Sequence, residues 1–233
     1  MMNVPELLYM RLQNQLLGSH ELKEPQDIVS WMGAMQSQTF DLARWAIGIR
    51  LQSKSVEDVN EALNTGKIIR THILRPTWHF VSADDFYWMF DLSNPRLKSA
   101  CRSSCKIHKA DESLIYKCIP VVEKALLGGK HLTKQEIVEL LSFQGFSVDY
   151  QFVTSVLSCA EIEGVLVNGR LRGSKHTYTL VEEWNPRKKT LHRDEALLLL
   201  ARKYFTSHGP ATIQDFTWWS GLTLTECRKA LEM

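Results

Sequence analysis

The chain has 233 residues, of which 44% are hydrophobic, 23% charged and 9% aromatic, and this excludes a mainly disordered protein. Its length predicts more than one small domain. The sequence has no apolar run of the roughly 18 residues that a membrane span requires, and no basic segment precedes an apolar stretch at the N-terminus. Its five cysteines are irregularly spaced. We therefore expect a cytoplasmic protein with free thiols and no membrane association.

The formal net charge of +2 is nearly neutral, but the basic residues are unevenly distributed. Residues 96–109 carry basic side chains and no acidic ones, and basic side chains also outnumber acidic ones over residues 168–193. A phosphate-binding surface can be built this way in a nearly neutral protein. Charge alone leaves solvated basic linkers as an equally good interpretation.

Residues 1–105 are predicted to form a first domain of helices followed by a β-hairpin. Apolar side chains at helical spacing predict four helices, over residues 25–35, 40–51, 56–63 and 86–92. Pro25 suits the first turn of a helix, and the sequence SADD from Ser82 forms a capping box for the last one. Residues 67–81 are β-prone, with a turn near Pro76.

Residues 106–186 repeat this order more clearly and are predicted to form a second domain. Three helices are expected, over residues 111–127, from the capping box Thr133–Glu136, and from the N-cap Asp149 to Gly164. Two short β-prone segments follow, at 165–167 and 177–181, joined by a basic loop. Two helices and a hairpin with a basic tip are typical of a winged helix, whose second helix enters a DNA groove. A tight turn at Asn168–Gly169 is a competing hairpin. We favour the longer loop because the second strand then gains a partner.

Residues 187–233 begin the same order a third time. Helices are expected over residues 194–205, from the capping box at Thr212, and from a further capping box at Thr223. No hairpin follows, so we expect a truncated third winged helix whose apolar face is poorly covered. Linkers are expected at 96–110 and 183–191. The predicted fold class is mainly α with small β-hairpins, an α+β fold of tandem winged-helix domains.

Gln36-Ser37-Gln38 is the candidate catalytic segment, at the predicted junction of two helices with Thr39 as a candidate N-cap. Residues at i and i+2 lie about 200° apart on a continuous helix, so the two glutamines converge only if the helix ends there. A carboxamide is not a base at neutral pH, but it can orient a water and present a dipole to developing positive charge. The alternative is that both glutamines cap helix ends or are simply solvated.

Candidate DNA-binding residues cluster at the two hairpins, and each is equally plausible as an ordinary surface residue or as the partner of a nearby acid. They are Arg70, His72, Arg75 and His79 at the first hairpin, and Arg170, Arg172, Lys175 and His176 at the second. The candidate ligands for a zinc site are Cys101, Cys105, His108 and Cys118. This spacing matches no familiar zinc motif, so we expect no metal and no other cofactor.

Four blocks of sequence, taken together, resemble the AlkZ/YcaQ-like winged-helix DNA glycosylases of bacteria. In family order they are MQSQTFDLARWAIGIRL (35–51), IRTHILRPTWHFV (69–81), NGRLRGSKHTYTL (168–180) and GPATIQDFTWWSGL (209–222). The resemblance implies tandem winged helices that form a concave DNA-binding body. It also implies a catalytic Gln-x-Gln motif, which falls here on Gln36 and Gln38, and release of N-alkylated purines, including crosslinked ones.

The implied chemistry suits carboxamides. An N7-alkylated purine is cationic, so its glycosidic bond breaks without protonation by the enzyme, and a strong general acid is not required. The enzyme has to stabilise an oxocarbenium-like sugar and position a water. We expect a monomer that acts on double-stranded DNA, is nucleoid-associated when bound, and has no obligate protein partner. The alternatives are a non-enzymatic winged-helix DNA-binding regulator and a winged-helix scaffold for protein contacts.

Overall fold

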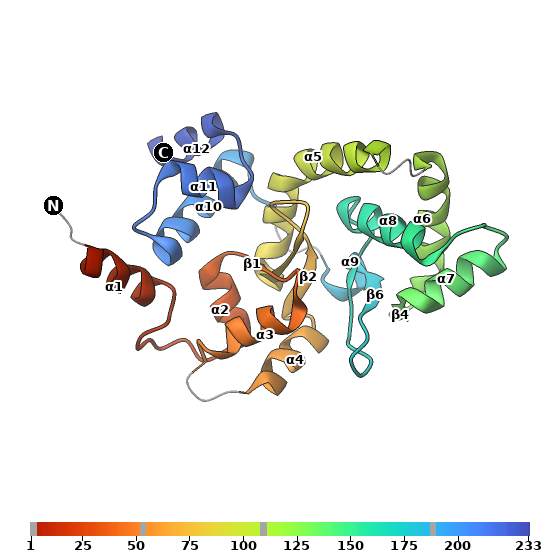
Figure 1. Ribbon diagram of the computed structural model, residues 1–233, viewed down its shortest axis with the longest axis horizontal. Coiled ribbons are helices and arrows are strands. Elements are labelled where there is room, and N and C mark those ends of the chain that lie inside the picture. The colour runs from red at the N-terminus through yellow and green to blue at the C-terminus, as the bar shows by residue number, and fades with distance from the viewer. Residues whose placement is uncertain (1–3, 52–54, 108–110, 187–189) are drawn as a thin grey trace.

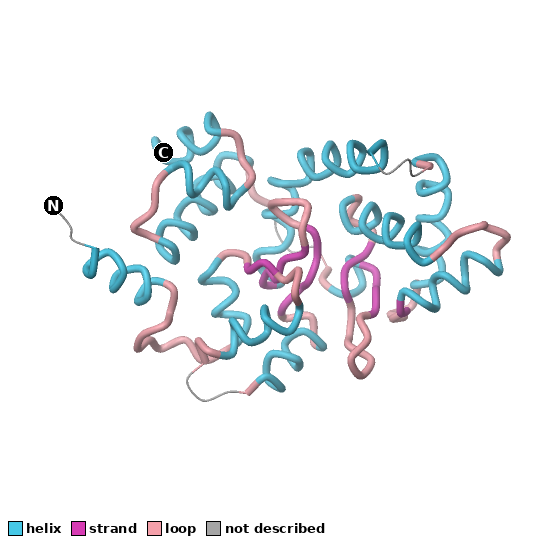
Figure 2. Tube along the Cα trace, in the orientation of Figure 1, coloured by secondary structure: helices cyan, strands magenta, loops and turns pink. Residues whose placement is uncertain are grey.

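The computed structural model describes residues 4–51, 55–107, 111–186 and 190–233. The described residues form a mainly helical molecule with two small three-stranded antiparallel sheets (Figures 1 and 2). Within these ranges no helix combines the length and the apolar character needed to cross a membrane.

The N-terminal part builds the first sheet on a layer of helices. Its helices are α1 Val4–Asn14, α2 Pro25–Met32, α3 Phe40–Gly48, α4 Val56–Asn64 and α5 Ala83–Ile107, and its strands are β1 Met35–Gln36, β2 Ile68–His72 and β3 Trp78–Ser82. The strand order is β1-β3-β2. The predicted hairpin is present, with Arg70 opposite Phe80. The predicted capping contact is also present, because the Asp85 backbone N–H donates to the Ser82 hydroxyl oxygen at 3.3 Å.

Helix α5 is much longer than the sequence predicted. It continues past Pro95 through most of the expected linker at 96–110, of which residues 108–110 lie outside the described ranges. The reason is tertiary: Leu97 is buried, and the Asn94 side chain donates to the Ile162 carbonyl oxygen at 2.6 Å. Packing of this half of the helix on the second part of the molecule outweighs its weak local helix signal.

The second part repeats the order of the first. Its elements are α6 Glu112–Leu126, β4 Leu132–Thr133, α7 Lys134–Phe143, α8 Tyr150–Ile162, β5 Leu166–Asn168, β6 Thr177–Leu180 and α9 Val181–Trp184. The strand order β4-β6-β5 matches that of the first sheet. The predicted capping box at Thr133 and the N-cap at Asp149 are confirmed. The longer hairpin loop is also confirmed, because Asn168 pairs with Tyr178 and this excludes a tight turn at Asn168–Gly169.

The C-terminal part consists of α10 Arg193–His208, α11 Ile213–Ser220 and α12 Leu224–Glu232. The capping boxes at Thr212 and Thr223 are as predicted. The apolar face of these helices is well covered, contrary to expectation. Leu200 and Phe216 are fully buried in one core together with Ile69 of the first sheet and Phe86 of α5. The side chains that cover this apolar face come from the first part of the molecule, and the sequence pattern did not indicate this contact.

Candidate functional site

The Gln-x-Gln segment lies on the edge of the first sheet, with its two glutamine side chains on the outside. Strand β1 pairs with β3, Gln36 standing opposite His79. Gln36 and Gln38 are exposed, whereas Ser37 between them is fully buried. Gln36 is the last residue of β1, and Gln38 lies two residues beyond it, so the two exposed side chains flank the buried Ser37. The predicted junction between two helices is present, because α2 ends at Met32 and α3 begins at Phe40, with the short strand β1 between them.

Hydrogen bonds with Trp78 and Arg70 hold the backbone of this segment in place. The Ser37 N–H donates to the Trp78 carbonyl oxygen at 2.7 Å. The Arg70 guanidinium donates to the Ser37 carbonyl oxygen from Nη2 at 3.1 Å and from Nε at 3.3 Å. Gln38 is itself restrained, because its Oε1 accepts from the Trp78 backbone N–H at 3.4 Å. These hydrogen bonds therefore restrict the conformations open to the backbone that carries the two glutamines.

Arg70 was a candidate DNA contact, but the structure places it inside the protein. It is 6% exposed, its Cζ lies 4.6 Å from the centre of the Trp78 ring, and Nη1 donates to Asn168 Oδ1 at 2.7 Å. Burial lowers the pKa of Arg70, and the nearby Glu161 carboxylate opposes that shift. With its donors directed at protein acceptors, Arg70 positions Ser37 and does not reach a phosphate.

A buried carboxylate, Glu161 on α8, organises the polar contacts between the first and second parts. It is 1% exposed and accepts from His72 Nδ1 at 2.5 Å, from Trp78 Nε1 at 3.1 Å and from Asn168 Nδ2 at 2.9 Å. The side chain of His72, another candidate DNA contact, is therefore held inside the protein by this hydrogen bond. Sequence reasoning missed Glu161, although one acid in the apolar run VLSCAEI was an available signal.

Two more candidate histidines are uncharged at neutral pH. His79 is 2% exposed, and burial lowers its pKa to about 4, while its Nδ1 donates to the Thr77 carbonyl oxygen. His176 packs edge-on against Phe40, with ring centres 4.5 Å apart. Partial burial and the charge of Arg70 lower the pKa of His176, also to about 4. Neither ring offers a positive charge to DNA.

The other four candidates keep solvent access. Arg170, Arg172 and Lys175 are exposed on the loop of the second hairpin, and Arg75 is partly exposed on the turn of the first. Arg172 Nη1 is engaged with Glu136 at 2.6 Å. The Arg170 guanidinium lies 5.4 Å from the centre of the Trp184 ring.

The hairpin loop 169–176 docks on the first part of the molecule. The Leu171 N–H donates to Asn64 Oδ1 of α4 at 2.8 Å, and the His176 ring packs on Phe40 of α3. Figure 1 shows this loop running alongside α3 and α4. The exposed cations of the loop are thus held at a set position relative to the first sheet, which carries the glutamines.

Comparison with known proteins agrees with this architecture. The family model for AlkZ-like DNA glycosylases matches residues 29–233. The chain belongs to the AlkZ-like DNA glycosylase family. It is 26% identical to an interstrand DNA cross-link repair glycosylase of Streptomyces sahachiroi, over 92% of this chain and 60% of that protein. Its fold matches the solved structure of the DNA glycosylase AlkZ from the same organism, with a TM-score of 0.75 and 22% identity.

That match covers all of this chain and 65% of the solved one, and it confirms a mainly helical fold with small antiparallel sheets. The chain spans about 60% of the length of its curated relative.

Proposed function

We propose that this protein is a DNA-repair glycosylase that releases N-alkylated purines, crosslinked ones included, from double-stranded DNA. The observation that carries the proposal is the pair of exposed carboxamides on Gln36, at the end of the edge strand β1, and on Gln38, two residues further on. We further propose that the three parts of the chain, 1–105, 106–186 and 187–233, are winged-helix units. In the second unit α8 packs on α5, α6 and α7 and exposes only Tyr150 and Gln151, so it is not a groove helix, and loop 169–176 would be the wing that contacts DNA.

In the proposed mechanism the alkylated base leaves as a neutral group, because the cationic base accepts the electron pair of the breaking glycosidic bond. Positive charge then develops on the sugar. The carbonyl oxygen of one glutamine stabilises that charge, and the carboxamide of the other holds the attacking water on the side of the sugar opposite the departing base. The water oxygen bonds to the sugar carbon that the base has left, and its extra proton passes to solvent. Arg70 keeps the Ser37 carbonyl oxygen in place, so that both side chains start from a set backbone.

DNA binding in this proposal depends on the exposed cations and not on the buried ones. Arg75, Arg170, Arg172 and Lys175 would contact phosphates, which neutralises backbone charge and releases counterions. Arg70, His72, His79 and His176 are assigned to the architecture behind the site, since they are buried or uncharged.

The decisive experiment is base release from a duplex that carries N7-methylguanine. We expect release by the unaltered chain and a loss of about a hundredfold or more in the double variant Gln36→Ala/Gln38→Ala, because groups of this kind act on the charge of the transition state. Gln135→Ala, at an exposed glutamine on α7, is the matched control and should keep full activity.

A non-enzymatic DNA-binding regulator predicts the opposite pattern. It would bind undamaged DNA with sequence preference, release no base, and tolerate Gln36→Ala. Salt-sensitive DNA binding does not separate the two functions, because both need phosphate contacts. Failure of the unaltered chain to release base from a duplex that it binds would therefore contradict the glycosylase proposal.

A further inference from the structure

Three cysteines from two helices converge beneath the polar network described above. Cys101 and Cys105 lie one turn apart on α5, and Cys159 lies on α8. Their sulfur atoms all lie within 4.8 Å of one another, and the Sγ atoms of Cys101 and Cys159 are 2.6 Å apart. This is the one group of three potential metal ligands from cysteine, histidine or acid found among the described residues.

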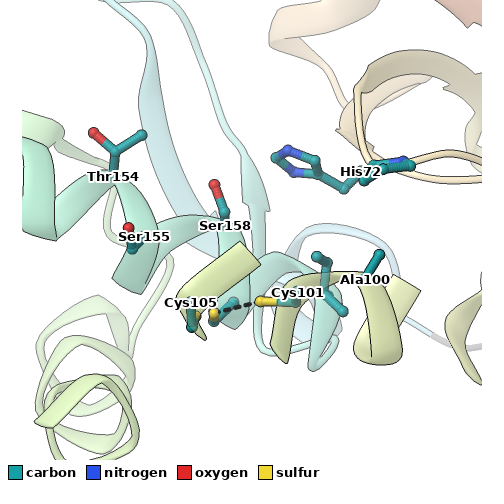
Figure 3. A pocket seen from close by; sticks show the side chains of 10 residues that line it. His72, Ala100, Cys101, Cys105, Thr154, Ser155 and Ser158 are labelled. Carbon is teal, nitrogen blue, oxygen red and sulfur yellow. Dashed lines mark hydrogen bonds between the residues drawn. The ribbon is translucent and has the colours of Figure 1, made fainter. Parts of the chain in front are cut away.

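A cavity of about 170 Å³ opens directly onto these sulfurs. Figure 3 shows Cys101 and Cys105 on one side of it and His72 on the other, with Ser158 beside them. A space of this size holds several waters, and its imidazole and hydroxyl groups give such waters polar partners. The cluster therefore has an open side with room for another ligand.

We propose that Cys101, Cys105 and Cys159 bind one thiophilic divalent cation of the zinc class, with its fourth coordination position facing the cavity. Thiolate sulfur is the ligand that favours such ions, and zinc sits about 2.3 Å from each sulfur. Tetrahedral geometry then separates the sulfurs by about 3.8 Å. The sulfurs, which lie within 4.8 Å of one another, would reach that spacing by side-chain rotation. Binding releases the thiol protons to solvent.

Hydrophobic packing alone explains the cluster of three cysteines less well than metal binding does. The chain's other two cysteines show the ordinary behaviour: Cys118 and Cys227 are fully buried and belong to no such group among the residues that the structure describes. A disulfide would use two of the three sulfurs and leave the third without a role. The sequence spacing missed the site because Cys159 is 54 residues beyond Cys105 and joins it only when α8 packs on α5. Of the residues first considered, Cys118 lies outside the cluster and His108 outside the described residues.

The bound ion would fasten α5 to α8, and so would link the first part of the molecule to the second. This role is independent of the proposed glycosylase activity, because it needs neither DNA nor the glutamines. It predicts a rise in melting temperature when the metal binds.

The test is titration of the full, reduced and chelator-treated chain with Co²⁺ as a spectroscopic probe. We expect sulfur-to-cobalt charge-transfer absorption and the visible bands of tetrahedral cobalt, saturating at one equivalent and abolished by Zn²⁺. Cys159→Ser should weaken binding more than about tenfold. Cys101→Ser, at a partly exposed position, should do the same and is the variant more certain to fold. Circular dichroism checks the fold of each.

Cys118→Ser is the matched control and should bind cobalt as the unaltered chain does. Three outcomes overturn the proposal: no thiolate–cobalt absorption in fully reduced protein, an unchanged spectrum in Cys101→Ser and Cys159→Ser, or equal loss in Cys118→Ser. A Cys101–Cys159 disulfide seen by mass spectrometry, without metal uptake after reduction, would assign the cluster to redox chemistry instead.

Discussion

At the scale of single residues, the candidate polar side chains divide into those exposed to solvent and those buried in hydrogen-bonded contacts inside the protein. Glu161 belongs to the second group, since it accepts hydrogen bonds from three side chains on three elements. Arg70 depends on the same charge, and links Ser37 to Asn168. Removing one member of a buried charged network leaves the others desolvated and unpaired, which is the most costly kind of change to a protein interior.

We therefore expect Glu161→Gln to lower the free energy of unfolding by about 3 kcal/mol, because it removes the buried negative charge and turns an amide N–H toward other donors. Urea denaturation at pH 7 measures this change. Glu139→Gln, at an exposed position of α7, is the control and should shift stability by less than about 0.5 kcal/mol. Equal stability of the Glu161→Gln protein and the unaltered chain would show that the network is not structural.

The buried His79 gives stability a defined pH dependence. Its folded pKa of about 4 lies below the ordinary value, so the unfolded chain takes up the proton first as pH falls. The contribution is complete above about pH 6.5 and is lost progressively toward pH 4, by at most about 3 kcal/mol. In His79→Asn, which keeps a donor near the Thr77 carbonyl oxygen, the decrease in stability between pH 7 and 4.5 should be about 2 kcal/mol smaller. Superimposable pH profiles would contradict this assignment.

At the scale of elements, the hairpin loop 169–176 shows how a short segment acquires a set position. Its β-bridge between Arg172 and Lys175 closes the tip, and Leu171 anchors the loop to α4. The sequence predicted the loop and its basic character, because glycines and cations are local signals. It did not predict the docking, because Asn64 is more than a hundred residues away in the chain.

The loop predicts a specific salt dependence of DNA binding. Arg170→Ala/Lys175→Ala should reduce the slope of log affinity against log salt by about 2, since each cation neutralises one phosphate. The control is Lys117→Ala/Lys124→Ala, which removes the same charge from the exposed face of α6. Fluorescence anisotropy across a salt series measures both variants. Identical slopes for the two would place the DNA contacts elsewhere.

At the scale of the whole molecule, one hydrophobic core draws on all three predicted domains. Ile69 of β2, Val167 of β5 and Leu200 of α10 belong to the same buried cluster. Lys203 reinforces the joint, because its ammonium group donates to the Ser30 carbonyl oxygen and pairs with Asp85 at 2.9 Å. The C-terminal helices are thus part of the support for the first sheet and its glutamines.

Because the core is shared, a destabilising substitution in α10 should also destabilise the first sheet. Leu200→Ala should destabilise the protein by about 3 kcal/mol and lower the hydrogen-exchange protection of β2 and β3 as well as that of α10. Leu198→Ala, at a 37% exposed neighbour, is the control and should change protection little. Loss of protection confined to α10–α12 would show that these helices unfold as a separate unit.

The sequence by itself determined most of the elements, their capping boxes and the family, because helix caps, apolar periodicity and turn glycines act over a few residues. It also singled out Gln36 and Gln38. Only the tertiary structure decided which cations face solvent, that an edge strand carries Gln36, and that Glu161 and Cys159 meet partners from other elements. The physical reason is that burial and pairing depend on which faces meet, and residues far apart in the chain supply those faces.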